Sequence, residues 1–527
     1  MNYLQKKKLA FMSIVNQIKG FIRTISGAFP LTLTDCVDNK SITNYSIHGN
    51  SMQDGVPTPD APIEVESVGE LTRNLITAND GYIHKISENR YIKYETETQV
   101  FTIQGQGLLT HVYFPETIPS GTTTSIFAEI INDDYEIVKG ELTIGGYGVS
   151  PSWQNVLNFS ATSAKKQSGV YTITADINRI CIFVDANADV KNVKVRITYA
   201  VCDTALTEYE PYGYKIPITV SGKNLFNKSD YQVDVNGAIG FSIRHLKIGT
   251  KYTISSNKPL TWVKISLASS GYNSVQFANE SGFYKYSFTM QRHSNISENE
   301  TQYLFLGSTV GERTFVNNIS QLDGFDIQIE EGSTTTDYEP YHESISTNIY
   351  LDEPLRKVGD YADYIDFENN EIVRNIGKYT FTGDERDWGG AVGYTGSFGY
   401  TVNISDLSLT VHKVGLCNHL TQSGFAGSVN RFAFHDAANH PYCCIFFLEK
   451  DFPDLGTYSP ETAKQIVKQM YDSGEPLILY YNTNTPTKEF VELPIIPTFK
   501  GTSIISVDTT IQPSNAEIEY YSNAKER

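Results

Sequence analysis

The 527-residue sequence lacks a long uninterrupted hydrophobic run. Its most apolar early stretch, Leu9–Ile18, follows three lysines and imitates the start of a secretion signal, but Lys19 and Arg23 interrupt it. A segment broken by charges is too short to span a bilayer, and a signal peptide rarely carries such charges before its cleavage site. We therefore expect neither export through this segment nor membrane insertion.

Basic residues are scarce relative to acidic ones. The chain has 42 Lys and Arg against 60 Asp and Glu, which gives a formal net charge of −18. Nucleic-acid binding requires a basic surface that displaces counterions from phosphates. The sequence therefore predicts no nucleic-acid partner.

The six cysteines are few and scattered, so they do not indicate a disulfide framework, and we expect buried reduced thiols. The densest group of zinc-binding residue types comprises Cys417, His419, His435, His440, Cys443 and Cys444. No cysteine pair with the usual spacing of two to four residues accompanies the histidines. The prediction is that these are ordinary, partly buried side chains and that the chain has no metal site and no cofactor.

Familiar catalytic motifs are also missing. The sequence has no Gly-x-Ser-x-Gly elbow, no phosphate-binding glycine loop and no His-Glu-x-x-His helix. Asp185–Asp189 alternates oxygen ligands as calcium loops do, but Val190 and Arg196 stand where glycine and the closing glutamate are needed, which favours a polar turn. Paired carboxylates for glycoside cleavage are recognised only in space. We predict a non-enzymatic protein and keep hydrolysis as an alternative.

The residues that are abundant are those of β-strands. Tyr (34) and Phe (27) far outnumber Met (5), and short runs of Val, Ile and Thr recur between Gly, Asn, Asp and Ser clusters. A chain of this length accommodates roughly three or four domains of about 150 residues. We expect a mostly β fold.

The N-terminal segment 1–29 is predicted to form a docking or oligomerisation helix. Its apolar residues are spaced by fours and threes, as in a two-heptad coiled-coil seam, and they are Phe11, Val15, Ile18, Ile22 and Ile25. An amphipathic helix packed on its own domain is the alternative. Segment 30–72 contains Pro57, Pro59 and Pro62, so we expect it to form an extended strap.

An internal repeat divides the middle of the chain. The first block opens with Arg73-Asn74-Leu75 and closes with Tyr209-Glu210-Pro211-Tyr212; the second opens with Lys223-Asn224-Leu225 and closes with Tyr338-Glu339-Pro340-Tyr341. Each block has the size of one domain and contains short alternating strands. We predict two jelly-roll-like β-sandwiches, at residues 73–212 and 213–341.

The remaining sequence has a different pattern. Residues 342–485 are predicted to form an α+β domain with one helix, which begins at the N-cap Ser459 followed by Pro460 and ends near Ser473, before Gly474. Residues 486–527 are interrupted by prolines, so we expect an extended tail along a surface.

Several of these phrases resemble one known group of proteins. The strap from Gly49 to Pro62, the repeated Tyr-Glu-Pro-Tyr closures and the run from Phe499 to Asn515 resemble tail or minor structural proteins of bacteriophages that infect Gram-positive bacteria. The resemblance covers nearly the whole chain. It implies a virion component of a tail tip, baseplate or fibre, made in the host cytoplasm, with jelly-roll domains similar to carbohydrate-binding modules. It supplies no catalytic residues.

Exposed aromatic side chains are the residues that would bind a sugar, because they offer a flat apolar face beside polar groups. The candidates are Trp153, Trp262 and Trp388, with Tyr147 as a weaker one. The alternative is that each tryptophan belongs to a sandwich core.

We therefore expect a structural and adhesive tail protein that contacts other tail or baseplate proteins and a host-surface polysaccharide. Weak single contacts gain strength when several copies act together, so a homo-oligomer, with a trimer favoured, is expected. The alternatives are a bacterial surface or secreted carbohydrate-binding adhesin and a polysaccharide-degrading tail enzyme.

Overall fold

A computed structural model of the chain describes most of residues 24–521. It leaves undescribed residues 29–30, 37–44, 78–80, 149–151, 268–269, 292–300, 311–313, 386–387, 391–395, 405–413, 438–439, 492 and 508–516. The described chain is mostly β, with several antiparallel sheets and the α-helix α2 (Pro460–Asp472). The mostly β prediction is confirmed. So is the C-terminal helix, where the Ser459 side chain accepts a hydrogen bond from the Thr462 N–H, as an N-cap does.

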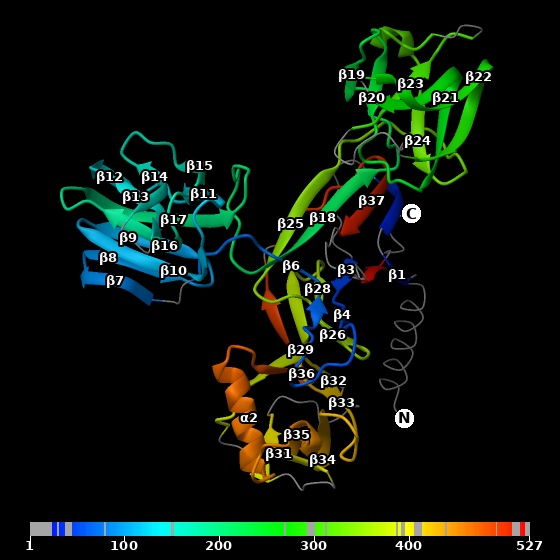
Figure 1. Ribbon diagram of the computed structural model, residues 1–527. Coiled ribbons are helices and arrows are strands. Elements are labelled where there is room, and N and C mark those ends of the chain that lie inside the picture. The colour runs from blue at the N-terminus through cyan, green and yellow to red at the C-terminus, as the bar shows by residue number, and fades with distance from the viewer. Residues whose placement is uncertain are drawn as a thin grey trace, which may run out of the picture.

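Segments near both ends of the chain combine with internal segments in a central β-sandwich (Figure 1). Its first sheet has the strand order β2-β37-β18-β25, with β6 also paired to β18. These strands are Leu31–Cys36, Gly501–Val507, Tyr214–Gly222, Ile345–Leu351 and Glu70–Leu71, respectively. Its second sheet has the order β1-β38-β3-β28-β29-β36-β32. Those strands are Thr24–Ala28, Glu517–Tyr521, Tyr45–His48, Tyr364–Asp366, Glu371–Phe381, Leu477–Phe490 and Gly415–Cys417.

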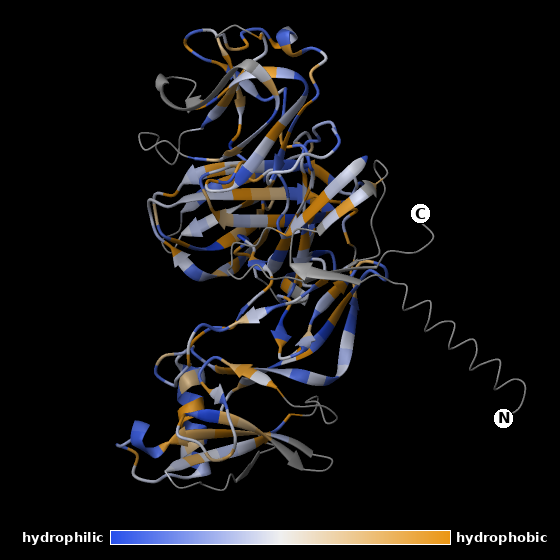
Figure 2. Cartoon of the chain, turned by 90° about the vertical axis from the view of Figure 1, so that its right-hand side faces the viewer, coloured by the Kyte–Doolittle hydropathy of each residue, from blue (hydrophilic) through white to orange (hydrophobic). Residues whose placement is uncertain are grey.

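The core of the central sandwich lies between these two sheets. Alternate residues of β18 are buried, as expected for a strand with one face on a core. The buried cluster includes Leu33, Ile47, Ile216, Ile218, Val220, Ile349, Ile365, Ile372, Ile496, Phe499 and Ile505. Figure 2 shows the same alternation of hydrophobic and hydrophilic residues along many strands. Two short antiparallel pairs complete this region, β4 (Ser51–Met52) with β5 (Glu66–Ser67) and β26 (Lys357–Val358) with β27 (Tyr361–Ala362).

The other domains are insertions between strands of the central sandwich. The first inserted domain lies between β6 and β18, and the second lies between β18 and β25. The C-terminal domain lies between β29 and β36, which run from the central sandwich into it: Ile372 packs in the central core, whereas Phe381 and Leu477 pack in the C-terminal core. The chain therefore returns to the central sandwich after each insertion.

The first inserted domain is a two-sheet sandwich. One sheet has the order β15-β11-β17-β9-β8-β7, with β12 also paired to β17. These strands are Lys166–Thr172, Thr123–Ile130, Asp189–Val201, Val100–Gly105, Arg90–Glu95, Gly81–Ser87 and Glu136–Lys139. The other sheet has the order β10-β16-β13-β14, with strands Leu108–Ile118, Ile177–Val184, Leu142–Gly148 and Trp153–Phe159. A single apolar core joins the two sheets.

The second inserted domain is built around two long paired strands, β21 (Lys251–Leu267) and β22 (Ser270–Thr289). The first part of β21 pairs with β24 (Ile327–Glu331), and its later part pairs with β23 (Tyr303–Gly307). All three strands contribute residues to one core. Strands β20 (Ile239–Ser242) and β19 (Tyr231–Val233) extend the β23 edge. A 3-10 helix, η1 (Ile319–Leu322), places Leu322 in the core.

The C-terminal domain packs helix α2 on a five-stranded sheet. The sheet order is β30-β31-β35-β34-β33, with strands Trp388–Gly390, Ser397–Asn403, His440–Leu448, Arg431–Ala437 and Thr421–Gln422, and η2 (Glu449–Asp451) follows β35. Ala463, Ile466 and Val467 are the buried residues of α2.

The residues of the repeated sequence motif meet where each inserted domain joins the central sandwich. We call this junction the neck of the domain. In the first neck, Arg73 donates to Glu210 from its backbone N–H and its side chain, and Lys215 of β18 lies 3.3 Å from the same carboxylate. In the second neck, Lys223 lies 2.8 Å from Glu339, which also accepts hydrogen bonds from Thr502 of β37. The buried carboxylate of Glu210 and the partly buried carboxylate of Glu339 therefore each join an inserted domain to the central sandwich.

Several segments differ from the sequence-based expectations. The predicted strap 30–72 contributes β2, β3 and β6 to the sheets of the central sandwich. The N-terminal helix is not seen among the described residues: Ile25 lies in β1, opposite Tyr520 of β38, while Phe11, Val15, Ile18 and Ile22 lie outside the described residues. Pairing with a distant strand overrides the helical spacing at Ile25. The expected surface tail contributes β37, which lies between β2 and β18 and buries Ile505.

Candidate ligand-binding face

The outer face of the sheet β10-β16-β13-β14 carries an aromatic and cationic row in the first inserted domain. Successive residues of a strand point to opposite faces, so the buried Ile144 and Ile180 define the core side. On the other side, Tyr113 lies opposite Arg179, Arg179 opposite Tyr147, and Tyr147 opposite Trp153. These four side chains cross the sheet from one edge to the other, and we call them the aromatic row.

The aromatic row is accessible and its members contact one another. Tyr113 is 59% exposed and Trp153 is 36% exposed. The Tyr147 and Trp153 rings meet edge to face with centroids 5.3 Å apart. The Arg179 guanidinium carbon lies 5.1 Å from the Tyr147 centroid and 5.5 Å from the Tyr113 centroid, so the cation is held over two aromatic rings.

A second row of residues lies beside the aromatic row, and it consists of His111, Cys181, Gly145 and Val156. Gly145 has no side chain and Cys181 is fully buried, so the exposed surface of this row comes from His111 and Val156 at its two ends. Burial raises the pKa of the Cys181 thiol to about 12, in spite of the nearby Arg179 charge. The thiol is therefore protonated and carries no charge beside Arg179.

His111 connects the two rows. Its ring centroid lies 5.3 Å from that of Tyr147. Burial and, secondarily, the Arg179 charge lower the pKa of His111, so the imidazole is neutral at pH 7. The buried His111 Nε2 and Arg179 Nε have no hydrogen-bond partner among the described residues. Buried polar atoms usually have partners, and the described residues supply none for these two nitrogens.

A β-bulge fixes Trp153 in this face. The pairing of β13 with β14 shifts between Gly145 and Gly146, and Asn155 adopts a positive φ of 49°. The Asn155 side chain donates hydrogen bonds to the Thr124 and Gly169 carbonyls of the opposite sheet. A side chain on Gly146 would collide with the Tyr199 hydroxyl at 2.6 Å. Hydrogen bonds to the opposite sheet therefore fix the bulge in β14, and with it the position of Trp153.

The structure separates the three tryptophans proposed from the sequence into three different domains. Trp262 lies in β21 and is only 8% exposed, with its ring edge to face with Phe315 at 6.3 Å. Trp388 lies in β30 opposite Val402, and its side chain lies outside what the structure describes. Only Trp153 is shown with an exposed ring, and Tyr147 joins it. Sequence reasoning did not propose His111, Tyr113 or Arg179.

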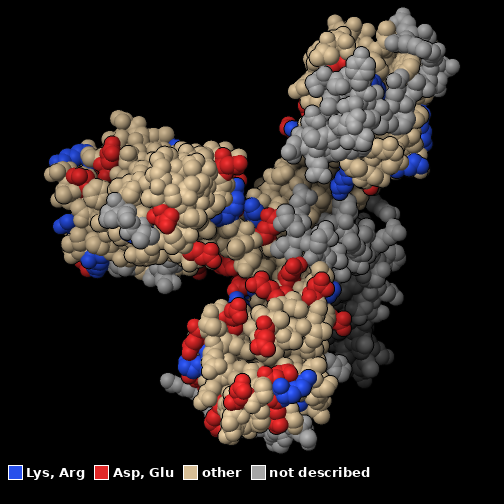
Figure 3. Space-filling model, in the orientation of Figure 1, with Lys and Arg blue, Asp and Glu red and all other residues tan. Residues whose placement is uncertain are grey.

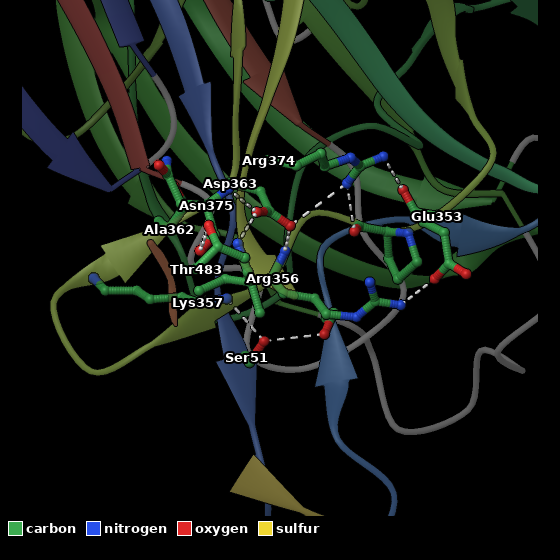
Figure 4. Close-up of polar contacts among 12 residues, drawn as sticks. Ser51, Glu353, Arg356, Lys357, Ala362, Asp363, Arg374, Asn375 and Thr483 are labelled. Carbon is green, nitrogen blue, oxygen red and sulfur yellow. Dashed lines mark hydrogen bonds and ion pairs between the residues drawn. The ribbon is translucent and has the colours of Figure 1, made fainter. Parts of the chain in front are cut away.

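The buried carboxylate of Asp363 is the other prominent polar cluster (Figure 4). One oxygen accepts from the N–H groups of Asn375 and Ile376, the other accepts from the Arg356 N–H, and Arg374 lies 3.5 Å away. Burial raises the pKa of Asp363, although these donors and the Arg374 charge oppose the shift. Both oxygens hold the middle of β29, at Asn375 and Ile376, to the loop before β26, which is a structural role.

The candidate metal-binding side chains that the structure describes are buried or held by other contacts, whereas those of His435 and His440 lie outside the described residues. Cys443 and Cys444 are buried in β35, and the His419 ring nitrogens lie 3.2 Å from the Pro59 and Glu475 carbonyls. Asp185 accepts from the Asn187 N–H, as in a polar turn. Within the described part of the chain, no group of three or more His, Cys, Asp and Glu residues is placed to hold a metal ion.

None of the helices in the described ranges is long and apolar enough to cross a membrane. No protein-family model matches the chain, and a comparison with curated proteins finds no significant match.

Proposed function

We propose that this chain is a non-enzymatic structural and adhesive component of a bacteriophage tail, and that the first inserted domain binds a carbohydrate of the host surface. The observation that carries the binding role is the row Tyr113, Arg179, Tyr147 and Trp153. Aromatic faces beside hydrogen-bonding groups are the chemistry that sugar rings require. The resemblance in the Tyr-Glu-Pro-Tyr closures and in the strap supports the assignment to a tail.

The architecture suits a protein that holds domains away from a shared base. Two of the insertions leave the central sandwich through necks closed by an ion-paired glutamate, so each is carried on an anchored base rather than on a loose linker. In Figure 1 the first and second inserted domains extend in different directions from the central sandwich. Several copies displayed together would raise a weak sugar affinity through avidity.

The test is binding of the purified full chain to intact Gram-positive cells, with soluble cell-wall polysaccharide as competitor. Trp153→Ala and Tyr113→Ala should each weaken saturable binding about tenfold, because exposed aromatic anchors commonly carry more than 1 kcal/mol of a binding free energy. Tyr171→Ala is the matched control, since Tyr171 is 43% exposed in β15 of the opposite sheet. Unchanged binding by both row variants, or an equal loss in the control, would refute a role for this face.

The homo-oligomer, with a trimer favoured, is part of the same proposal. Deleting residues 1–23 spares β1, which pairs with β38, and should yield folded monomers when the mass is measured by light scattering. A deletion variant that keeps the full assembly mass would show that these residues do not hold the copies together.

A further inference from the structure

Arg179 has a charge that the described part of the protein does not neutralise. None of the ion pairs among the described residues includes Arg179, and its one side-chain hydrogen bond goes from Nη1 to the Asn178 amide oxygen at 2.6 Å. Its Nε is buried without a partner. A guanidinium normally offers its donors as a planar fork to a carboxylate or phosphate. Arg179 therefore retains donors for an anionic group from outside the chain.

The position of Arg179 places such an anion beside a sugar ring. Arg179 lies between Tyr113 and Tyr147 in the aromatic row, and Trp153 lies two strands from it. Neighbouring strands are about 4.8 Å apart, so Trp153 and Arg179 are separated by roughly 10 Å across the sheet. A sugar on the Trp153 and Tyr147 rings would thus direct a charged substituent, or the next unit of the polymer, toward Arg179.

The neighbours of Arg179 favour an anion and do not compete for the cation. The residues that face outward around it are Leu109, His111, Tyr113, Thr143, Tyr147, Val156 and Phe183, and none of them is acidic. His111 is neutral at pH 7, as argued above, so it adds no charge beside Arg179, and its buried Nε2 has no partner among the described residues. The site thus combines one cation with uncharged hydrogen-bonding and aromatic groups.

The rest of the protein would repel an anionic polymer. The net charge is −18, and Figure 3 shows acidic side chains gathered over the C-terminal domain and its junction with the central sandwich. Nonspecific attraction of a negatively charged glycan is therefore disfavoured. Binding of such a glycan would depend on the local contribution of Arg179.

We propose that this face recognises an anionic saccharide, one with a carboxylate or phosphate next to a sugar ring, and that Arg179 is its anion-binding residue. This inference rests on the proposed carbohydrate-binding function and specifies its ligand class. The two sources of negative charge, a uronic acid and a phosphodiester-linked polymer, share the same contact with the guanidinium.

The experiment measures calorimetric affinities of the full chain for three soluble polymers of similar length: a neutral glycan, a uronic-acid glycan and a sugar-substituted glycerol-phosphate polymer. The wild type should bind at least one anionic polymer about 10-fold to 100-fold more tightly than the neutral one, as expected for hydrogen bonds to a charged group. Which anionic polymer is preferred identifies the source of the charge.

Two substitutions at Arg179 and one elsewhere sharpen the result. Arg179→Gln should remove the preference for the anionic polymer over the neutral glycan, while Arg179→Lys should restore part of that preference, since the charge remains but the planar fork is lost. Arg196→Gln is the matched control, because the Arg196 guanidinium also lies over a tyrosine ring, 5.4 Å from the Tyr209 centroid, and its Nε also has no partner, but it belongs to the opposite sheet.

The outcomes separate this inference from the proposed function. Equal wild-type affinity for neutral and anionic polymers, with binding still dependent on Trp153, would overturn the anionic ligand and keep carbohydrate binding. An anionic preference that survives in Arg179→Gln, or that Arg196→Gln abolishes, would overturn the role of Arg179. Failure of the wild type to bind any of the three polymers would overturn both proposals. Circular dichroism and thermal unfolding check that each variant is folded.

Discussion

The first and second inserted domains are attached in the same way and differ in what they expose. In the first neck, Asn74 accepts from the N–H groups of Ile76 and Tyr199 and donates to the Ile197 carbonyl. In the second, Asn224 accepts from the N–H groups of Phe226 and Ile329 and donates to the Ile327 and Glu339 carbonyls. The repeated asparagine thus closes each inserted domain at its base, beside the glutamate that contacts the central sandwich.

The outer faces of the two domains share one feature and differ in the exposure of their tryptophans. Both hold a cation over two aromatic rings, Arg179 in the first domain and Lys264, near Phe305 and Phe315, in the second. The tryptophans differ, because Trp153 lies in the edge strand β14, whereas Trp262 lies in β21 between β22 and β23. A ring on an edge strand has neighbours on one side only and stays accessible. The comparison teaches that a repeat can conserve an attachment while leaving the exposed surface free to vary.

The largest expected effect contrasts the two tryptophans. Trp262→Ala should lower the free energy of unfolding of the second domain by about 3 kcal/mol, because it removes a large buried ring. Trp153→Ala should lower that of the first domain by about 1 kcal/mol or less and act mainly on ligand affinity. Chemical denaturation followed by hydrogen exchange resolves the two domains. A destabilisation that is larger for Trp153→Ala would break the distinction between core and face.

The equivalence of the necks predicts matched effects from their asparagines. Asn74→Ala and Asn224→Ala should each destabilise their own domain by about 2–3 kcal/mol, since each leaves buried backbone donors and an acceptor unsatisfied. Hydrogen exchange should rise in β17 for the first variant and in β24 for the second. The exposed Asn158→Ala is the control and should stay within about 0.5 kcal/mol of the wild type. If either variant keeps the stability of the wild type, the asparagine of that neck does not stabilise its domain.

Local signals in the sequence were sufficient for some of these features. The strand-rich composition predicted the mostly β fold, and Ser459 before Pro460 predicted the start of α2, because both depend on neighbouring residues alone. The repeat identified the residues of the necks, although not their pairing. Ile25 was misassigned because its partner Tyr520 lies at the other end of the sequence. No local pattern reports so distant a pairing.

The candidate face was out of reach for the same reason. Tyr113, Tyr147 and Arg179 belong to three separate strands, and the register of the sheet alone makes them neighbours. Residue type suggested Trp153 and Trp262 equally, because exposure depends on whether a strand lies at an edge or in the middle. A signal for Arg179 existed only in hindsight, as one cation among alternating apolar residues of β16.

The smallest expected effect is a difference in pH response between the two necks and the Asp363 joint, by which we mean the Asp363 carboxylate and the backbone N–H groups that it accepts from. Although burial opposes it, the hydrogen bond from Arg73 lowers the pKa of Glu210, and that from Lys223 lowers the pKa of Glu339, below the ordinary value of 4.5. The stabilisation from both carboxylates is therefore present above pH 4.5 and is lost as the pH falls through their folded-state pKa values. We expect hydrogen exchange at both necks to increase below pH 4.5.

Asp363 should respond with the opposite sign. Its pKa is raised above the ordinary 3.8, so its titration favours the folded state at low pH and this contribution is lost as the pH rises through the folded-state pKa. Acid should thus loosen the necks of the two inserted domains before it loosens the middle of β29, where Asp363 is bonded. Glu210→Gln, which cannot titrate, should flatten the pH response of the first neck and leave the second unchanged. If both necks and the Asp363 joint loosen together in the wild type, or if Glu210→Gln leaves the first neck as acid-sensitive as before, the local carboxylates do not control the attachment.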